Sequence, residues 1–163
     1  MDSSAPTKPD YLTRMETAFG APGEAGFGSA VFHEVLKGTD DLSQAAKVKY
    51  RTFVGQLWER FGEAAWMGPW REAYVRDPAT RPDIAAELRG IGDPDARLSV
   101  PMLLENVEGA ETARAALSAA FDDPEVSELR VFNLGDGEAM SGLLVAGRRG
   151  ASGETTFLVF LMD

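Results

Sequence analysis

Aromatic and basic side chains gather in one short stretch of this 163-residue chain. Trp58, Trp66 and Trp70 fall within thirteen residues, and Arg71 and Tyr74 follow them. Tryptophan and tyrosine dominate docking hot spots, and an arginine beside them could hold an anionic group. Trp66, Trp70, Tyr74 and Arg71 are therefore candidate binding residues for a ligand or a partner. The alternative is a corner where two helices share a core, because aromatic residues at helical spacing are usually core.

A second candidate site is basic. Lys47 and Arg51 are four residues apart, so they share one face of the helix predicted there. Basic side chains on one helix face could dock an acidic protein partner. The alternative is a solvated helix flank. Lys47 and Arg51 complete the set of candidate partner-binding residues.

The chain has one histidine, His33, and no cysteine. Without cysteine it has no disulfides, thiolate nucleophiles or sulfur-ligated zinc, and one histidine cannot form a multi-imidazole metal site. Any histidine general base would have to be His33, and the sequence identifies no partner for it. The serines lack the Gly-x-Ser-x-Gly context of a nucleophile elbow. These absences favour a non-enzymatic protein, and no cofactor is predicted.

Acidic residues occur in pairs such as Asp40-Asp41 and Asp122-Asp123. Each pair lies at a turn or helix cap with small or polar neighbours, whereas a catalytic carboxylate pair needs a desolvated member. We therefore interpret the pairs as solvated caps. The loop 133–138 carries three oxygen ligands at alternating positions but lacks the further ligands of a calcium loop. No metal site is predicted.

The formal net charge is −10 and is unevenly distributed. Residues 77–128 contain twelve acidic and four basic residues, whereas residues 41–76 contain four acidic and six basic residues. The acidic balance argues against nucleic acid as a partner, because phosphate binding depends on accumulated lysine and arginine. A basic segment within an acidic molecule could steer the docking of a protein partner.

The composition is that of a globular protein, with 44% hydrophobic and 26% charged residues. No apolar run approaches the roughly 18–20 residues that cross a bilayer, and residues 1–9 lack the apolar core of a secretory signal. We expect a cytoplasmic protein without a membrane partner. Residues 1–9 are predicted to form a disordered arm, and residues 10–163 a single domain.

The part from residue 10 to residue 90 is predicted to be helical. A helix capped by Ser29 is expected to end before Gly38, and the residues before Leu42 are good helix starters. Apolar spacing predicts helices over 11–19, 29–37, 42–65, 70–75 and 82–88.

The part from residue 97 to residue 163 is predicted to form a sheet. We expect the order strand, helix, strand, strand, strand over 98–104, 110–121, 129–134, 141–149 and 155–162. Pro101 would place the first strand at an edge, and glycine-rich turns would join the last three strands as antiparallel hairpins. The predicted fold class is α+β, with a helical N-terminal half packed on a small, mostly antiparallel C-terminal sheet.

The segment 155–162 is apolar on both alternating faces, which predicts a strand buried on both sides. Either the helices cover both faces or a second copy of the chain covers one. The second arrangement makes a homodimer a hypothesis.

These observations favour a non-enzymatic protein-interaction or regulatory module. An immunity-like or inhibitor-like role against a basic partner would fit the acidic segment 77–128. The alternative is a small-molecule-binding domain whose pocket lies between the helices and the sheet, lined by Trp66, Trp70, Tyr74 and Arg71.

Overall fold

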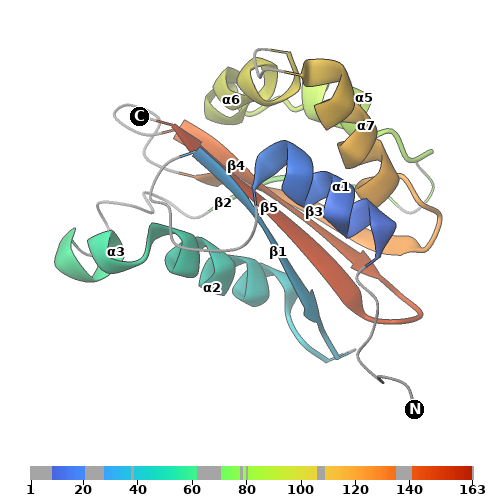
Figure 1. The fold of residues 1–163 in the computed structure, drawn as a ribbon, viewed down its shortest axis with the longest axis horizontal. Coiled ribbons are helices and arrows are strands. Elements are labelled where there is room, and N and C mark those ends of the chain that lie inside the picture. Colours follow the sequence, from blue (N-terminus) through green and yellow to red (C-terminus); the bar gives the residue numbers. More distant parts are fainter. Residues whose placement is uncertain are drawn as a thin grey trace.

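The computed structural model describes residues 9–20, 28–37, 39–61, 71–77, 79, 81–105, 109–134 and 141–162 (Figure 1). Its helices are α1 (Asp10–Phe19), α2 (Leu42–Val54), α3 (Gln56–Phe61), α5 (Ile84–Arg89), α6 (Pro94–Leu104) and α7 (Ala110–Phe121). Its strands are β1 (Gly28–Val35), β2 (Arg71–Val75), β3 (Val126–Leu134), β4 (Ser141–Arg149) and β5 (Glu154–Met162).

The strands form one sheet in the order β1-β5-β4-β3-β2, with every neighbouring pair antiparallel. β3, β4 and β5 follow one another as a meander, as predicted from their turn residues. β1 and β2 come from the earlier part of the chain and form the two edges. The fold is therefore α+β, with most strands toward the C-terminus, which confirms the predicted class.

Helices cover both faces of the sheet. Figure 1 shows α1, α5, α6 and α7 on one face and α2 on the other. Each side has its own apolar cluster: one joins the first helix group to the sheet, and the other joins α2 to the opposite face. None of the described helices is both long and apolar enough to cross a membrane.

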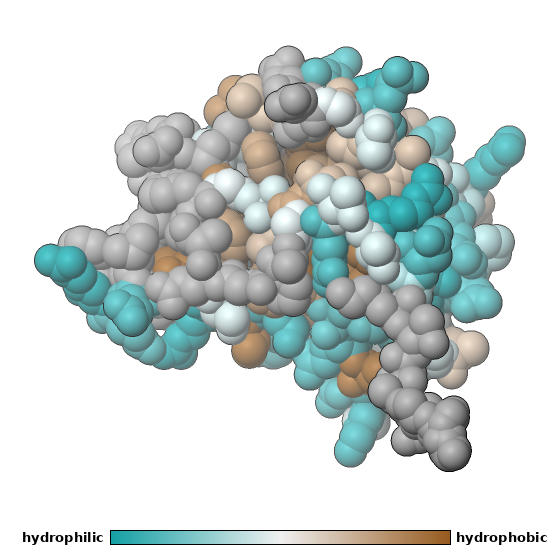
Figure 2. Space-filling model, in the orientation of Figure 1, coloured by the Kyte–Doolittle hydropathy of each residue, from teal (hydrophilic) through white to brown (hydrophobic). Residues whose placement is uncertain are grey.

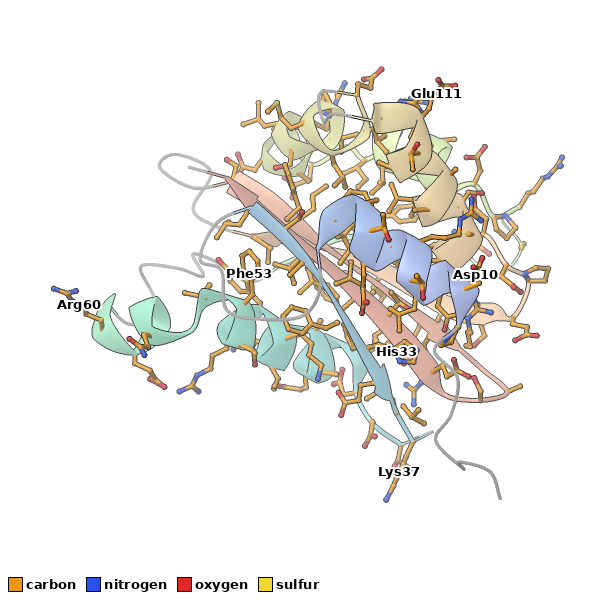
Figure 3. The ribbon with its side chains drawn as sticks, in the orientation of Figure 1. Asp10, His33, Lys37, Phe53, Arg60 and Glu111 are labelled. Carbon is orange, nitrogen blue, oxygen red and sulfur yellow. The ribbon has the colours of Figure 1, made fainter. Side chains whose placement is uncertain are left out.

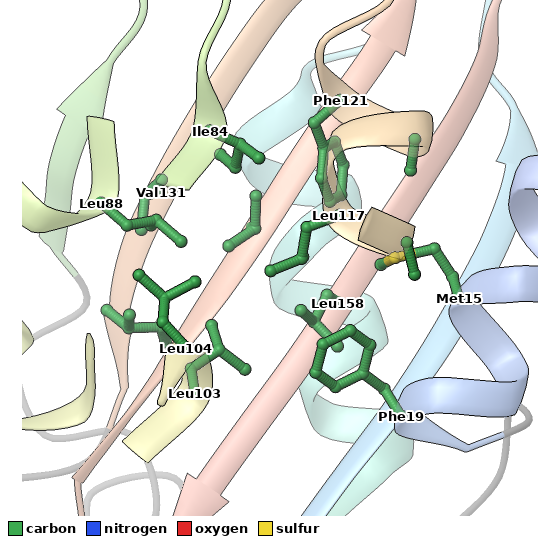
Figure 4. Close-up of a cluster of buried hydrophobic side chains, with 14 of the residues drawn as sticks. Met15, Phe19, Ile84, Leu88, Leu103, Leu104, Leu117, Phe121, Val131 and Leu158 are labelled. Carbon is green, nitrogen blue, oxygen red and sulfur yellow. The ribbon is translucent and has the colours of Figure 1, made fainter. Parts of the chain in front are cut away.

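β5 is buried on both sides, as its apolar pattern predicts. Leu158 points into the cluster under α1 and α7, whereas Phe157, Val159 and Leu161 belong to the cluster under α2. Figure 4 shows the first cluster, where Leu158 lies among side chains from several helices. Of the two alternatives drawn from the sequence, the helices supply the cover, so a homodimer is not needed to bury this strand.

The predicted helix starting at Ser29 is wrong, because this segment is the edge strand β1. Val31 lies in the cluster under α1, whereas Ala30 and Phe32 lie in the cluster under α2. The apolar residues fit a helical stripe as well as an alternating strand, and the antiparallel pairing with β5 decides between them.

The predicted helix over 70–75 is also wrong. Residues Arg71–Val75 form β2, which pairs with β3 from Arg71 opposite Asn133 to Val75 opposite Arg130. Five residues are too few for helical periodicity to be distinguished from alternation. Residue 70 and the residues before it, from 62 onward, lie outside the described part.

The predicted edge strand over 98–104 is wrong as well, because this segment belongs to α6. Asp93 caps the helix by accepting from the N–H groups of Asp95 and Ala96, at 3.0 and 3.3 Å, and Pro94 occupies the first turn. Pro101 lies within the helix on its exposed face. Pro101 therefore does not mark an edge strand.

The helices predicted over 11–19, 82–88 and 110–121 agree with the structure to within a few residues. α1 and α7 form where predicted, and α7 has the predicted bounds. The long helix expected over 42–65 is divided, because Gly55 adopts a φ of 67° and ends α2 after Val54. Residues 62–65 lie outside the described part.

Gly147 of β4 lies against Phe121 at the end of α7. A Cβ at this position of β4 would lie 2.6 Å from Cδ1 of the buried Phe121 side chain. Gly147→Ala should therefore lower the free energy of unfolding by about 1–3 kcal/mol, because Phe121 must move within a packed core. Chemical denaturation measures this change. Gly92→Ala is the control, since a Cβ there meets no heavy atom of the described residues within 4 Å; equal stabilities for the two variants would contradict the prediction.

Candidate functional site

The structure gives His33 the partners that the sequence could not identify. His33 lies near the C-terminal end of β1, on the side of the strand that faces α1 (Figure 3). The Tyr11 hydroxyl donates to Oε1 of Glu154 at 3.0 Å and lies 3.3 Å from Nε2 of His33. Since the hydroxyl proton is directed at Glu154, the hydroxyl oxygen is left to accept from Nε2–H. Histidine, tyrosine and glutamate thus form one chain of hydrogen bonds.

A buried arginine supports this chain of hydrogen bonds. The guanidinium carbon of Arg149 lies 4.1 Å from the ring centre of Tyr11, a cation–π contact. Arg149 also lies 3.2 Å from the carboxylate of Asp123 and 3.6 Å from that of Glu125. It therefore ties α1 to the end of α7 and to the turn that follows it.

The local environment shifts the pKa values of both ring groups. Burial lowers the pKa of His33 below its ordinary value of 6.5; Arg149 acts in the same direction, while Glu154 and Glu16 oppose it. Burial raises the pKa of Tyr11 above 10.0, and its hydrogen bond to Glu154 adds to the increase. At neutral pH the uncharged forms of both groups are therefore favoured, so the cluster is held together by hydrogen bonds and not by an ion pair of His33 with Glu154.

A second polar cluster is buried deeper. Arg76 and Glu87 form a bidentate ion pair at 2.7 and 2.6 Å, and both side chains are only 6% exposed. The Arg76 guanidinium also donates to the carbonyl of Phe121, and Asp122 accepts from the N–H of Ile84 at 2.7 Å. The cluster joins the residue after β2 to α5 and to the end of α7. Its hydrogen bonds are all internal, which indicates a structural role.

Tyr74 is the candidate binding residue whose surroundings the structure defines best. It lies half-buried on β2, and its hydroxyl donates to Oε1 of Glu87 at 2.7 Å. Burial, followed by this hydrogen bond, raises the pKa of Tyr74 to about 12. Trp66 and Trp70 lie outside the described residues, as does the side chain of Arg71, so the predicted aromatic pocket stays a prediction.

The carboxylate pairs are only partly the solvated caps that the sequence suggested. Asp41 caps α2 as predicted, by accepting from the N–H of Ser43 at 2.8 Å. Asp122 differs, because it is half-buried and lies 3.5 Å from Arg76. Burial raises the pKa of Asp122, and its hydrogen bonds from Ser118 and Ile84 oppose the increase. The interpretation of Asp122 as a solvated cap is wrong, because its ion-pair partner lies far away in the sequence.

The basic residues of α2 are engaged in pairs at the surface. Arg51 donates to Glu59 of α3 at 2.8 Å, and both side chains are more than half exposed. Lys49 lies 2.9 Å from Glu34 of β1. Lys47 also has an interaction partner. Each basic side chain of α2 therefore already has an interaction, and Arg51 is the most exposed of the ion-paired ones, at 57% against 20% for Lys49.

Two open hollows follow the outer side of α2 and meet at Val48. The first has a volume of about 330 Å³, and its charged lining residues are Glu34, Asp40, Asp41 and Lys49. The second, of about 350 Å³, includes Arg51 and Glu59. We call the two hollows together the α2 groove. Val48 is 58% exposed between them.

A third hollow lies between α5 and α6 and has a volume of about 310 Å³. Its lining residues are Leu88, Arg89, Arg97, Val100, Pro101 and Glu105. None of the three hollows is lined by the His33 cluster. Among the described residues, no group of three or more histidine or acidic side chains is arranged to hold a metal ion.

Comparison with known proteins gives no assignment. A scan against protein-family models, a search of curated proteins and a search of solved structures each found no match to this chain.

The Arg76–Glu87 pair should matter far more than the Arg51–Glu59 pair. Glu87→Ala leaves the Arg76 charge buried, and we expect a loss of about 3–5 kcal/mol in the free energy of unfolding. Glu59→Ala removes an exposed pair and should cost less than about 1 kcal/mol. Chemical denaturation of both variants tests this. Similar losses would show that the Arg76 cluster does not fasten α5 and α7 to the sheet.

The lowered pKa of His33 predicts a dependence of stability on pH. In the window just below pH 6.5, unfolded His33 binds a proton that the folded protein does not, so acidification lowers stability. His33→Gln removes this contribution, while the carboxylates titrate in both proteins. The stability difference between wild type and H33Q should change between pH 7.5 and about 5.5, with the wild type losing more. A constant difference over this range would contradict the lowered pKa.

Proposed function

We propose that this chain is a non-enzymatic interaction or regulatory module that binds an acidic region of a protein partner through the α2 groove. The exposure of Val48 between paired basic side chains carries this proposal. An aliphatic side chain at the centre of a groove with charges around it has the arrangement of an anchor site with a polar rim. Val48 supplies the apolar contact. Arg51 supplies the positive charge, in the hollow that Glu34, Asp40 and Asp41 do not line.

The charge distribution supports an acidic partner. Residues 42–61, which form α2 and α3, contain four basic residues and one acidic residue. Residues 81–125, which carry α5, α6 and α7, contain ten acidic and four basic residues. An acidic partner approaching this molecule is therefore oriented toward the α2 side of the sheet.

The ion pairs on α2 do not oppose this binding. Arg51 and Glu59 are 57% and 66% exposed, and such pairs contribute at most about 1 kcal/mol. A partner's carboxylate can therefore replace Glu59 at little cost. Figure 3 shows Arg60 pointing away from the body of the molecule at the end of α3, where a partner can reach it. In Figure 2 the α3 end of the molecule is hydrophilic.

The described residues favour docking of a protein over binding of a small molecule between the layers. The two apolar clusters fill the spaces between the described helices and the sheet with buried side chains. Small-molecule sites are concave and bury most of their ligand. The α2 groove is instead open along its length, which suits a protein surface.

Charge reversal on α2 tests the proposal. The full chain serves as bait in a native lysate, beside Lys47→Glu/Arg51→Glu and a control, Arg14→Glu/Arg81→Glu, with the same change in charge. We expect the α2 variant to lose the partner and the control to keep it. With the purified partner, affinity should fall about tenfold or more, mainly through slower association.

Two further checks make the outcome specific. The midpoint of thermal unfolding should be similar in the wild type and both variants. All four substituted side chains are exposed or half-buried, so none of them belongs to the core. Val48→Ser should weaken binding without changing its salt dependence, since it removes the apolar anchor alone. Loss of the partner in the control as well, or its retention in the α2 variant, would reject this surface.

A further inference from the structure

The hollow between α5 and α6, called here the α5–α6 groove, lies on the opposite side of the sheet from α2 (Figure 1). Buried Leu88 and Val100 and exposed Pro101 provide its apolar lining. Beside it, Leu98 is 57% exposed and Met102 is 38% exposed. These two residues are one turn apart on α6, so they form a continuous apolar rim.

The charged side chains of this groove are poorly satisfied. The backbone N–H of Arg97 donates to the carbonyl of Asp93, but its guanidinium makes no hydrogen bond or ion pair with any residue that the structure describes. Arg89 reaches Glu105 only at 3.9 Å, and both of these side chains are about half exposed. Two guanidinium groups and one carboxylate thus surround an apolar surface with their hydrogen-bonding capacity largely unused.

We propose that the α5–α6 groove binds the C-terminus of a peptide that ends in an aliphatic residue. The terminal carboxylate is held by Arg97 and Arg89, because a guanidinium matches the two oxygens of a carboxylate. The last side chain packs on the exposed Pro101 and on the rim of Leu98 and Met102, above the buried Leu88 and Val100. Glu105 accepts a hydrogen bond from a backbone N–H of the peptide. Each of the three charged groups then has a partner on one ligand.

The charge of the molecule restricts the ligand to a single carboxylate. The α5–α7 segment is acidic overall, so a ligand with several negative charges would be repelled. Arg89, Arg97 and Glu105 together carry one net positive charge, which matches one carboxylate. Glu105 further distinguishes a peptide from a fatty acid, since a fatty acid has no N–H group to donate.

The probe is the peptide acetyl-Gly-Ser-Gly-Ser-Ala-Leu with a free C-terminal carboxylate, titrated into the ¹⁵N-labelled full chain and followed by NMR. We expect saturable shifts confined to amides of residues 88–105. The C-terminal amide of the same peptide, and the free peptide ending in serine, should each bind about tenfold more weakly or worse.

Substitutions of arginine locate the site, and hexanoate distinguishes a fatty acid from a peptide as the source of the carboxylate. Arg97→Gln should weaken binding about tenfold, whereas Arg14→Gln, a control arginine on α1, should leave it unchanged. Both variants should give wild-type spectra away from the substitution. Hexanoate binding as well as the peptide would overturn the peptide assignment in favour of a fatty acid. Equal binding of the peptide amide, shifts located on α2, or no shift at millimolar peptide would overturn the site.

Discussion

Strands β4 and β5 carry large apolar side chains on both faces of the sheet, so water has to be excluded from both sides. Leu143 and Val145 face α6 and α7, whereas Leu144 and Ala146 face α2. Burying a large apolar side chain contributes about 1.5–3 kcal/mol, which makes an uncovered face too costly for a domain of ordinary stability. The chain therefore places helices on each side. The positions of its polar clusters and surface grooves follow from that arrangement.

The buried polar clusters lie where these helices meet the strands. Arg76 fastens α5 and the end of α7 to the sheet, and Arg149 joins α1 to the end of α7. Burial and internal hydrogen bonds account for the shifted pKa values of Tyr74, Glu87 and Tyr11. Burial alone would raise the pKa of Glu87, but the hydrogen bonds from Arg76 and Tyr74 lower it. The pKa shifts of these groups are explained by the burial and hydrogen bonds that join the helices to the sheet, and a catalytic role is not required to explain them.

The sequence predicted those elements whose local signals agree. β5 has alternating apolar faces, and α7 has a regular stripe, so both formed where expected. β1 and β2 were missed because their hydrogen bonds come from strands distant in the sequence, and short segments fit either period. The partners of His33 depend on the register of β1 against β5 and on the position of α1. The contacts of His33 with Glu154 and Tyr11 therefore could not be inferred from the spacing of residues in the sequence. Lys47 and Arg51 were found as a pair on a helix, but the ion pair of Arg51 with Glu59 depends on the break at Gly55.

The layered fold also separates the two surfaces for which we propose partners. The α2 groove and the α5–α6 groove lie on opposite sides of the sheet, beyond a packed layer of side chains on each face. Packed layers are about 10 Å apart, whereas exposed charges are screened over about 8 Å at physiological salt. The basic surface of α2 and the arginines of the α5–α6 groove therefore act nearly independently of each other. A partner on α2 does not cover the other groove, so both surfaces can be occupied together. Two small sites of this kind, each modest in affinity, would gain by acting on one linked partner.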